Sequence, residues 1–280
     1  MPPEALTSEI YAGEPRHCRL SLQVCADALE AVVRPLDPAT GTDADFLYRR
    51  IPYTVAADTP ARALEEAVYA NPLLVAPFAR TDVLLRTPGC MVLPADADAD
   101  TAVAAAALMG IDSPQAEPLV ASAGRLYSVA AMVDRAVLGF VRRTFDMART
   151  VAHPMAVLMR WFASRSALGN SGKVYVNLRP DSSDILVYNH LGPAGAVTVG
   201  GTSLPDTIYY IMAMASAAGL QGDRCEVHLA GMAERRAALA AELGKYLPAV
   251  VPAIIPSALL AMGRQALAAP LELSILPLCE

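Results

Sequence analysis

The sequence of 280 residues is poor in several residue types that mark common functional classes, and each shortage excludes something. Only 18% of the residues are charged, and the net charge of −6 argues against a general nucleic-acid-binding protein. There is no C-x-x-C pair and the four histidines lack metal-ligand spacing, so we expect no zinc site. A G-x-S-x-G motif is also missing, which removes the usual signature of a serine hydrolase.

The five cysteines are an odd number and lie far apart, so we expect reduced, buried side chains and no disulfide framework. Residues 1–15 have neither a basic start nor an apolar core, and a signal peptide is not expected. The longest uncharged run, 246–263, is interrupted by prolines and barely reaches the ~20 residues that span a bilayer. We interpret this run as a buried strand and loop, and we expect a cytoplasmic protein without membrane contact.

Core-forming residues are abundant, since 54% of the chain is hydrophobic. The clearest pattern lies between residues 173 and 246, where the segments read as strand, strand, strand, helix, strand and helix. These segments are 173–180, 184–191, 196–201, 204–220, 225–231 and 232–246. Thr202 or Ser203 is placed to cap the first of these helices.

A looser copy of the same order begins near residue 19. RLSLQVCA (19–26) alternates apolar and polar residues, which is typical of a half-buried strand. Thr59 followed by Pro60 predicts the start of a helix, because threonine is a good N-cap and proline suits the first helical position. Near the C-terminus, LELSILPL (271–278) predicts one more strand.

Each half therefore has the order βββαβα, and each begins with a hairpin before its first helix. Two such α/β units in tandem resemble the ribonuclease H-like fold that is duplicated in the sugar kinase, heat-shock chaperone and actin superfamily. We expect a degenerate actin-like ATPase fold of two lobes, 18–168 and 169–280. Their boundary lies in the turn-forming stretch ALGNSG (167–172).

Several short motifs follow one another in an order that resembles a narrower group. They are LSLQVCAD with Asp27, NPLLVAPF, VLP, LPDTIYYIMAM with Asp206, Tyr209 and Tyr210, HLAGM around Gly231, Lys245-Tyr246 and Cys279-Glu280. This order is similar to an uncharacterised Bacteroidetes family that carries a domain-of-unknown-function label and has an actin-like ATPase fold. The resemblance implies a bacterial protein with that fold, and it transfers no activity.

Actin-like ATPases hold ATP between their lobes with two β-hairpin loops. Each loop combines an acidic residue near Mg²⁺ with glycines that let backbone N–H groups approach phosphate. The equivalent turns here would contain Asp27 and Asp181, but their glycines are absent, and Pro180 removes a backbone donor. Asp27 and Asp181 are therefore either magnesium-side carboxylates or ordinary turn residues.

Two other glycine positions allow a similar pair of interpretations. Gly231 stands where the adenosine-binding loop of the superfamily would begin, but Met232 follows it, so it fits a strand-to-helix turn as well. Gly200 and Gly201 precede a predicted helix and could cradle an anion, although Asp206 in the first turn would repel it.

Residues 121–180 carry nine basic residues against two acidic ones, which indicates either an anion-facing surface or the polar faces of helices. We hypothesise a non-catalytic, degenerate actin-like scaffold that binds a protein partner and needs no cofactor. The alternative is an actin-like ATPase or nucleotide-dependent switch that binds Mg-ATP with Asp27, Asp181 and Gly231. A third hypothesis is an accessory protein that binds RNA or another polyanion through 121–180.

Overall fold

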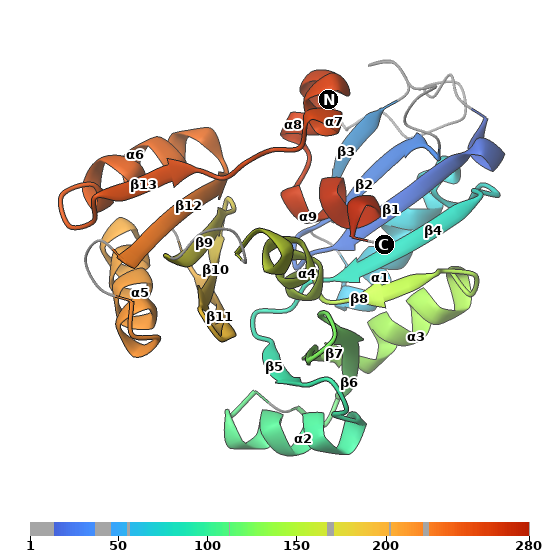
Figure 1. Cartoon of the computed structure of the whole chain (residues 1–280). Coiled ribbons are helices and arrows are strands. Elements are labelled where there is room, and N and C mark those ends of the chain that lie inside the picture. Colours follow the sequence, from blue (N-terminus) through green and yellow to red (C-terminus); the bar gives the residue numbers. More distant parts are fainter. Residues whose placement is uncertain are drawn as a thin grey trace.

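The computed structural model describes residues 14–36, 46–54, 57–111, 113–166, 171–201, 203–220 and 224–279. Within these ranges the framework consists of two five-stranded sheets and one three-stranded sheet, with helices packed against them (Figure 1). The two large sheets have the same topology, because their strand orders are β3-β2-β1-β4-β8 and β11-β10-β9-β12-β13. In both, three antiparallel strands are extended by two parallel ones.

The first large sheet is formed before residue 153. Its strands are β1 (Cys18–Val24), β2 (Ala28–Pro35), β3 (Leu47–Pro52), β4 (Arg80–Leu85) and β8 (Thr150–Ala152). Its helices are α1 (Pro60–Tyr69) and α3 (Arg135–Thr144), with short 3-10 turns at Pro15–His17 and Pro72–Val75. Helix α1 begins where the sequence predicts it, since the Thr59 side chain accepts a hydrogen bond from the Arg62 backbone N–H at 3.3 Å.

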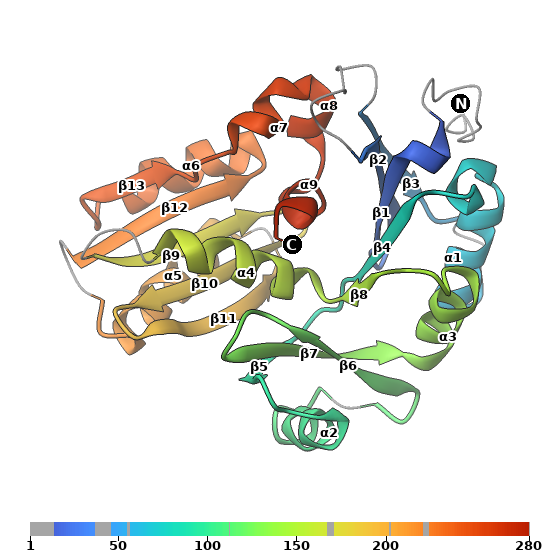
Figure 2. The ribbon, with the colours of Figure 1, turned by 45° about the vertical axis from the view of Figure 1, so that its right-hand side comes forward.

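A smaller sheet is inserted between β4 and α3. It contains β5 (Met91–Pro94), β6 (Ala116–Ser122) and β7 (Tyr127–Asp134), and α2 (Ala99–Leu108) packs against it (Figure 2). Strand β6 was not predicted from the sequence, because Pro118 weakens its strand pattern. The strand lies at the edge of the sheet order β5-β7-β6, where a proline is tolerated.

The second large sheet follows α4 (Pro154–Ser166). Its strands are β9 (Gly172–Leu178), β10 (Ser182–Asn189), β11 (Gly192–Gly200), β12 (Cys225–Gly231) and β13 (Ala249–Pro252), and its helices are α5 (Leu204–Ala217) and α6 (Ala233–Leu243). Both faces of β9 and β10 are covered, which explains their continuous apolar runs. Val176 and Ile185 pack toward α5 and α6, whereas Tyr175 and Tyr188 belong to the core of the first half.

Helix α4 joins the two large sheets. The ring of Phe162 stacks on Tyr175 of β9 with a centroid distance of 4.0 Å, and the Tyr188 hydroxyl donates to the Met159 carbonyl at 2.9 Å. Because these contacts are buried, α4 fixes the second sheet against the hydrophobic core of the first half.

The C-terminal segment forms three short helices, α7 (Ser257–Ala261), α8 (Gly263–Ala268) and α9 (Leu271–Ile275), with a 3-10 turn at Leu276–Leu278. The strand predicted at 271–278 is therefore wrong, since Pro270 precedes a helical turn and a short apolar run does not separate strand from helix. For residues 246–263 the sequence predicted a buried strand and a loop. A strand, β13, is present, but it is partly exposed, and α7 replaces part of the predicted loop.

These C-terminal helices return to the first large sheet. The Tyr48 backbone N–H of β3 donates to the Gln265 side chain at 2.9 Å, and Leu273 and Ile275 lie in the same core cluster as Leu20 of β1. The division into lobes at 168 and 169 remains a prediction, although the chain after 257 packs on the first sheet. None of the helices in the described part of the chain combines the length and apolarity that crossing a membrane requires.

Candidate functional site

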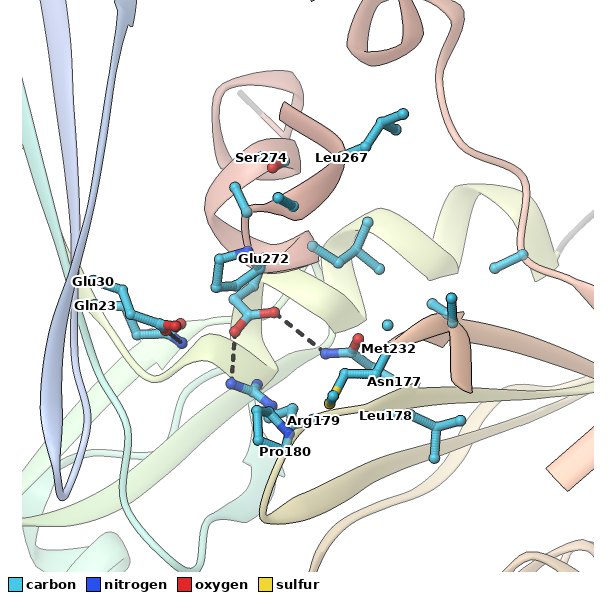
Figure 3. Close-up of a pocket in the computed structure, with 18 of the residues that line it drawn as sticks. Gln23, Glu30, Asn177, Leu178, Arg179, Pro180, Met232, Leu267, Glu272 and Ser274 are labelled. Carbon is cyan, nitrogen blue, oxygen red and sulfur yellow. Dashed lines mark hydrogen bonds and ion pairs between the residues drawn. The ribbon is translucent and has the colours of Figure 1, made fainter. Parts of the chain in front are cut away.

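A cavity of about 690 Å³ lies between the two large sheets. It is bounded by the ends of the β1–β2 and β9–β10 hairpins, by the β12–α6 turn and by helices α7 to α9 (Figures 1 and 3). The three residues predicted from the sequence as nucleotide-site candidates, Asp27, Asp181 and Gly231, all line this cavity. The fold thus brings together residues that are 204 positions apart in the chain (27 to 231).

The two hairpins place equivalent side chains at the cavity. Gln23 of β1 lies opposite Glu30 of β2, and Asn177 of β9 lies opposite Asp184 of β10. In each pair the amide donates to the carboxylate, at 3.0 Å for Gln23 and 3.3 Å for Asn177. The hairpins therefore carry the same amide–carboxylate pair at the same register.

The turns that follow are also equivalent. The Cys25 backbone N–H donates to the Ala28 carbonyl at 2.9 Å, and the Arg179 backbone N–H donates to the Ser182 carbonyl at 3.0 Å. Cys25 thus corresponds to Arg179, and Asp27 corresponds to Asp181.

Both turn aspartates are paired with arginines from the same chain. Arg50 of β3 contacts Asp27 at 2.5 Å, and Arg86, directly after β4, contacts Asp181 at 2.6 Å. Partial burial would raise the pKa of Asp181, but the hydrogen bond and charge of Arg86, together with Ser182, hold it below its usual range. No sequence pattern identified either arginine, because each reaches its aspartate only through the folded sheet.

Gly231 has a conformational and a packing reason to be glycine. Its φ is +86°, and a Cβ atom there would lie 2.0 Å from the backbone oxygen of Leu178 in β9. The strand-to-helix turn therefore explains the residue without a ligand, and its role toward a nucleotide stays a prediction. The neighbouring candidate loop is tied to the second hairpin, since the Gly201 backbone N–H donates to the Asp181 carbonyl at 2.7 Å.

The second hairpin is held by a buried ionic network that the sequence did not reveal. Arg179 contacts Asp184 at 2.6 Å and Glu272 of α9 at 2.6 Å, and Asn177 donates to Glu272 at 3.2 Å (Figure 3). Burial alone would lower the pKa of Arg179, but the charges of Asp184 and Glu272 outweigh it and raise that pKa. The sequence did not identify Glu272, because residues 271–278 were predicted to form a strand and nothing indicated that Glu272 faces the cavity.

The first hairpin has no arginine in the corresponding place. Glu30 accepts hydrogen bonds from the Tyr48 hydroxyl at 3.0 Å and from Gln23, and burial and the negative charge of Glu272 raise its pKa. Burial, followed by the charge of Glu30, raises the pKa of the Cys25 thiol to about 12. Cys25 is therefore protonated at neutral pH and is a poor nucleophile.

The described residues of the cavity do not form a metal-binding cluster. Among the described residues, no group of three or more histidine, cysteine, aspartate or glutamate side chains is placed to hold a metal ion.

The basic residues of 121–180 are spread over several elements. Arg142 of α3 contacts Glu117 at 2.7 Å, and Lys173 of β9 contacts Glu226 at 2.7 Å. The Arg165 guanidinium lies 3.1 Å from the centre of the Trp161 ring. These intramolecular contacts give part of the charge a structural role, and binding of a polyanion stays a prediction.

Comparison with solved structures defines the class of protein. A Bacteroides thetaiotaomicron protein, described as having an actin-like ATPase fold and unknown function, matches with a TM-score of 0.78 and 17% identity over 95% of this chain and 97% of that chain. A structure of the PilM–PilN type IV pilus biogenesis complex matches with a TM-score of 0.54 and 14% identity over 95% of this chain and 98% of the matched chain. These likenesses confirm the predicted actin-like ATPase fold.

The sequence also identifies the family. Residues 9–250 match the family model described as "Protein of unknown function (DUF3822)", and the chain belongs to this family. No curated protein matches the sequence. The predicted resemblance to a family of unknown function with an actin-like ATPase fold is confirmed.

Proposed function

We propose that this protein is a non-catalytic actin-like scaffold that binds a protein partner and does not use Mg-ATP. The observation that carries the proposal is the pairing of both turn aspartates with arginines of the same chain, Arg50 with Asp27 and Arg86 with Asp181. A magnesium-side carboxylate must accept bonds from the ion or its waters, and an arginine bound to it competes for the same oxygens.

The second hairpin is also unsuited to phosphate. Pro180 offers no backbone N–H in the turn, and Arg179, which could otherwise face an anion, is neutralised by Asp184 and Glu272. A phosphate placed here would meet the carboxylate of Glu272 at close range, and like charges in a buried site repel strongly.

A groove on the second half supports the binding role. It has a volume of about 480 Å³ and lies between α5 and α6, with Leu204, Tyr209 and Tyr246 among its lining residues. Tyr209 is 67% exposed and Tyr246 is 62% exposed. Exposed tyrosines are frequent anchors of protein interfaces. Two of the motifs that carry the family resemblance, LPDTIYYIMAM and Lys245-Tyr246, meet at this groove.

Calorimetric titration with Mg-ATP and Mg-ADP tests the proposal. We expect no saturable heat at millimolar nucleotide. The matched control is Asp206→Ala, which removes an aspartate outside the cavity. Saturable binding that Asp27→Ala abolishes and Asp206→Ala preserves would overturn the proposal.

That result would favour the second candidate function, a nucleotide-dependent switch. The observation in its favour is the position and size of the cavity, since about 690 Å³ between the lobes suffices for a small ligand. In that case Arg86→Met should strengthen nucleotide binding, because it frees the Asp181 carboxylate.

A further inference from the structure

Four arginines line the cavity between the lobes, namely Arg50, Arg86, Arg179 and Arg236, and three buried carboxylates lie at it or next to it. Arg179 is the only arginine in direct contact with Asp184 and Glu272 among the described residues, and it serves both carboxylates. Glu30 faces the same cavity, and among the described residues its closest cation is Arg50 at 4.0 Å. Arg50 itself is bound more closely by Asp27, at 2.5 Å.

Asp184 and Glu272 thus share one guanidinium, that of Arg179, and Glu30 shares Arg50 with Asp27. The residues Glu30, Asp184 and Glu272 are buried, with exposed fractions of 9%, 2% and 0%. A buried charge without a counterion is costly, so this cluster favours the entry of a cation or the uptake of a proton.

Gln23 provides an independent indication of a ligand. Its side chain is fully buried and lines the cavity, and its amide N–H₂ donates to Glu30. This bond fixes the amide orientation, because a carboxylate accepts from the nitrogen and not from the oxygen. The remaining atom, Gln23 Oε1, has no hydrogen-bond partner among the described residues. A buried acceptor of this kind is normally satisfied, so the cavity lacks a donor.

Figure 3 places the polar groups on facing sides of the cavity. Gln23 and Glu30 enter from β1 and β2, and Glu272 points in from α9. Leu267 lies on the α8 side, and Ile254, Leu267 and Ala269 contribute an apolar wall. Ile254 is 74% exposed and Leu267 is 50% exposed, so this wall is accessible. A ligand that fits both parts carries hydrogen-bond donors at one end and an apolar body at the other.

We propose that the cavity binds an organic cation, a primary ammonium group on an apolar chain. The ammonium lies among Glu30, Glu272 and the Gln23 oxygen, and the chain lies along the wall that includes Leu267. An ammonium has three donors and no acceptor, which suits a site made of acceptors. Each oxygen of Glu272 has two lone pairs and accepts one bond, from Arg179 or from Asn177, so each can accept one more donor.

Two other occupants fit less well. A phosphate or carboxylate ligand at this place would face the carboxylates of Glu30 and Glu272, and Arg179, the arginine that contacts Glu272, is already bound by two carboxylates. Arg236 of α6 also lines the cavity, but no contact joins it to Glu30 or Glu272 among the described residues. A multivalent metal ion needs several close ligands, and no such cluster exists in the described part of the chain. The inference rests on the proposed function in one respect, namely that the cavity is not a nucleotide site.

The test uses the full chain and a series of n-alkylammonium ions from butyl to octyl, measured by calorimetry at neutral pH. We expect saturable binding that strengthens about fourfold for each added methylene, as burial of the chain against the apolar wall requires. The neutral alcohol of equal chain length should bind at least about tenfold more weakly, because it cannot form charged hydrogen bonds.

Two variants locate the site. Glu30→Gln keeps the shape and removes the charge, and it should weaken hexylammonium about tenfold while leaving hexanol unchanged. Leu267→Ser should reduce the gain per methylene without removing the preference for ammonium. The matched control is Glu226→Gln, because the Glu226 carboxylate pairs with Lys173 outside the cavity. It should change neither the affinity for hexylammonium nor the gain per methylene.

Absence of binding by every alkylammonium ion would overturn the inference and would mean that protons alone balance the cluster. Equal binding of alcohol and ammonium, or binding that Glu30→Gln does not weaken, would also overturn it. These outcomes are distinguished from those of the Mg-ATP titration, since the alkylammonium series contains no phosphate. Loss of ammonium binding overturns this inference alone, whereas saturable Mg-ATP binding overturns the proposed function.

Discussion

The β1–β2 and β9–β10 hairpins are the same structure with different charges. Both place an amide opposite a carboxylate, and both continue into a turn with an aspartate. At the residue between these features the first hairpin has Cys25 and the second has Arg179. This difference affects how each hairpin meets the cavity, because Arg179 binds the second hairpin to α9, whereas the Cys25 thiol forms hydrogen bonds with Glu30 and Gln23 of its own hairpin.

The comparison separates what the duplicated fold requires from what each copy has acquired. The register and the amide–carboxylate pair recur, so they belong to the shared scaffold. The arginines do not recur at matching positions, since Arg50 lies on β3 whereas Arg86 follows β4. The charge of the cavity is therefore set by side chains from outside the hairpins, and substitutions there can test which copy depends on them.

The largest effect is expected for Arg179→Met. This change leaves Asp184 and Glu272 buried without their counterion, which costs about 3–5 kcal/mol of unfolding free energy. Urea denaturation followed by circular dichroism measures the loss. The additional substitutions Asp184→Asn and Glu272→Gln should restore part of it, and a single Arg179→Met variant with unchanged stability would contradict the network.

Gly231→Ala is expected to have the next largest effect. The register places Gly231 beside Leu178, just as Leu85 lies beside Val24 in the first half, but only the second copy needs a glycine there. A Cβ atom would approach the Leu178 oxygen to 2.0 Å at a φ of +86°. We expect a loss of at least about 2 kcal/mol.

The control for Gly231→Ala is Gly192→Ala. Gly192 also has a positive φ, +115°, but a Cβ atom there would have nothing within 4 Å. It should therefore report the cost of backbone strain alone, about 1 kcal/mol. Equal losses at the two glycines would mean that the close approach of β9 contributes nothing.

The two hairpins should also differ in their response to pH. The pKa of Glu30 is raised, so its stabilising effect is complete below the unfolded value of 4.5 and is lost as the pH rises through the folded pKa. The pKa of Asp181 is lowered, so its contribution is present above the unfolded value of 3.8 and is lost as the pH falls. Stability curves of Glu30→Gln and Asp181→Asn between pH 3 and pH 8 measure both.

Glu30→Gln should remove the decline of stability above pH 4.5 and should leave the protein as stable as the natural chain, or more stable, at neutral pH. Asp181→Asn should instead lower stability at neutral pH by less than about 1 kcal/mol, because Asp181 is 61% exposed and its ion pair is screened. A neutral-pH loss in Glu30→Gln would indicate that Glu30 is charged and well paired in the native state.

The sequence predicted most of the fold because its elements carry local signals. Thr59 and Ser203 cap helices as expected, and the two hairpins follow from apolar runs around turn residues. The C-terminus was predicted wrongly, since the helical state of residues 271–275 depends on packing against β1 and α4. For the site, the sequence offered Asp27, Asp181 and Gly231 as nucleotide-binding candidates; the three line one cavity, and their role toward a nucleotide stays a prediction.

The sequence did not identify the charges that control the cavity. Glu272 reaches Arg179 across 93 residues, and Arg86 reaches Asp181 across 95. Such pairs leave no local pattern, because each arginine directly follows a strand, where the local sequence is equally compatible with an exposed side chain. They could be recognised only after the sheets were placed.

The smallest effect is expected for Arg50→Ala, which removes the arginine that binds the turn aspartate of the first hairpin. Arg50 is 42% exposed and Asp27 is 69% exposed, so solvent screens their ion pair and its loss should cost less than about 1 kcal/mol. The loss of stability in Arg50→Ala should shrink further in 1 M salt, where exposed pairs are screened, whereas the loss in Arg179→Met should persist. Denaturation of both variants at low and high salt measures this contrast. A salt-insensitive loss above about 2 kcal/mol in Arg50→Ala would mean that the first hairpin is held as strongly as the second, and the contrast between the exposed Arg50–Asp27 pair and the buried Arg179 network would fail.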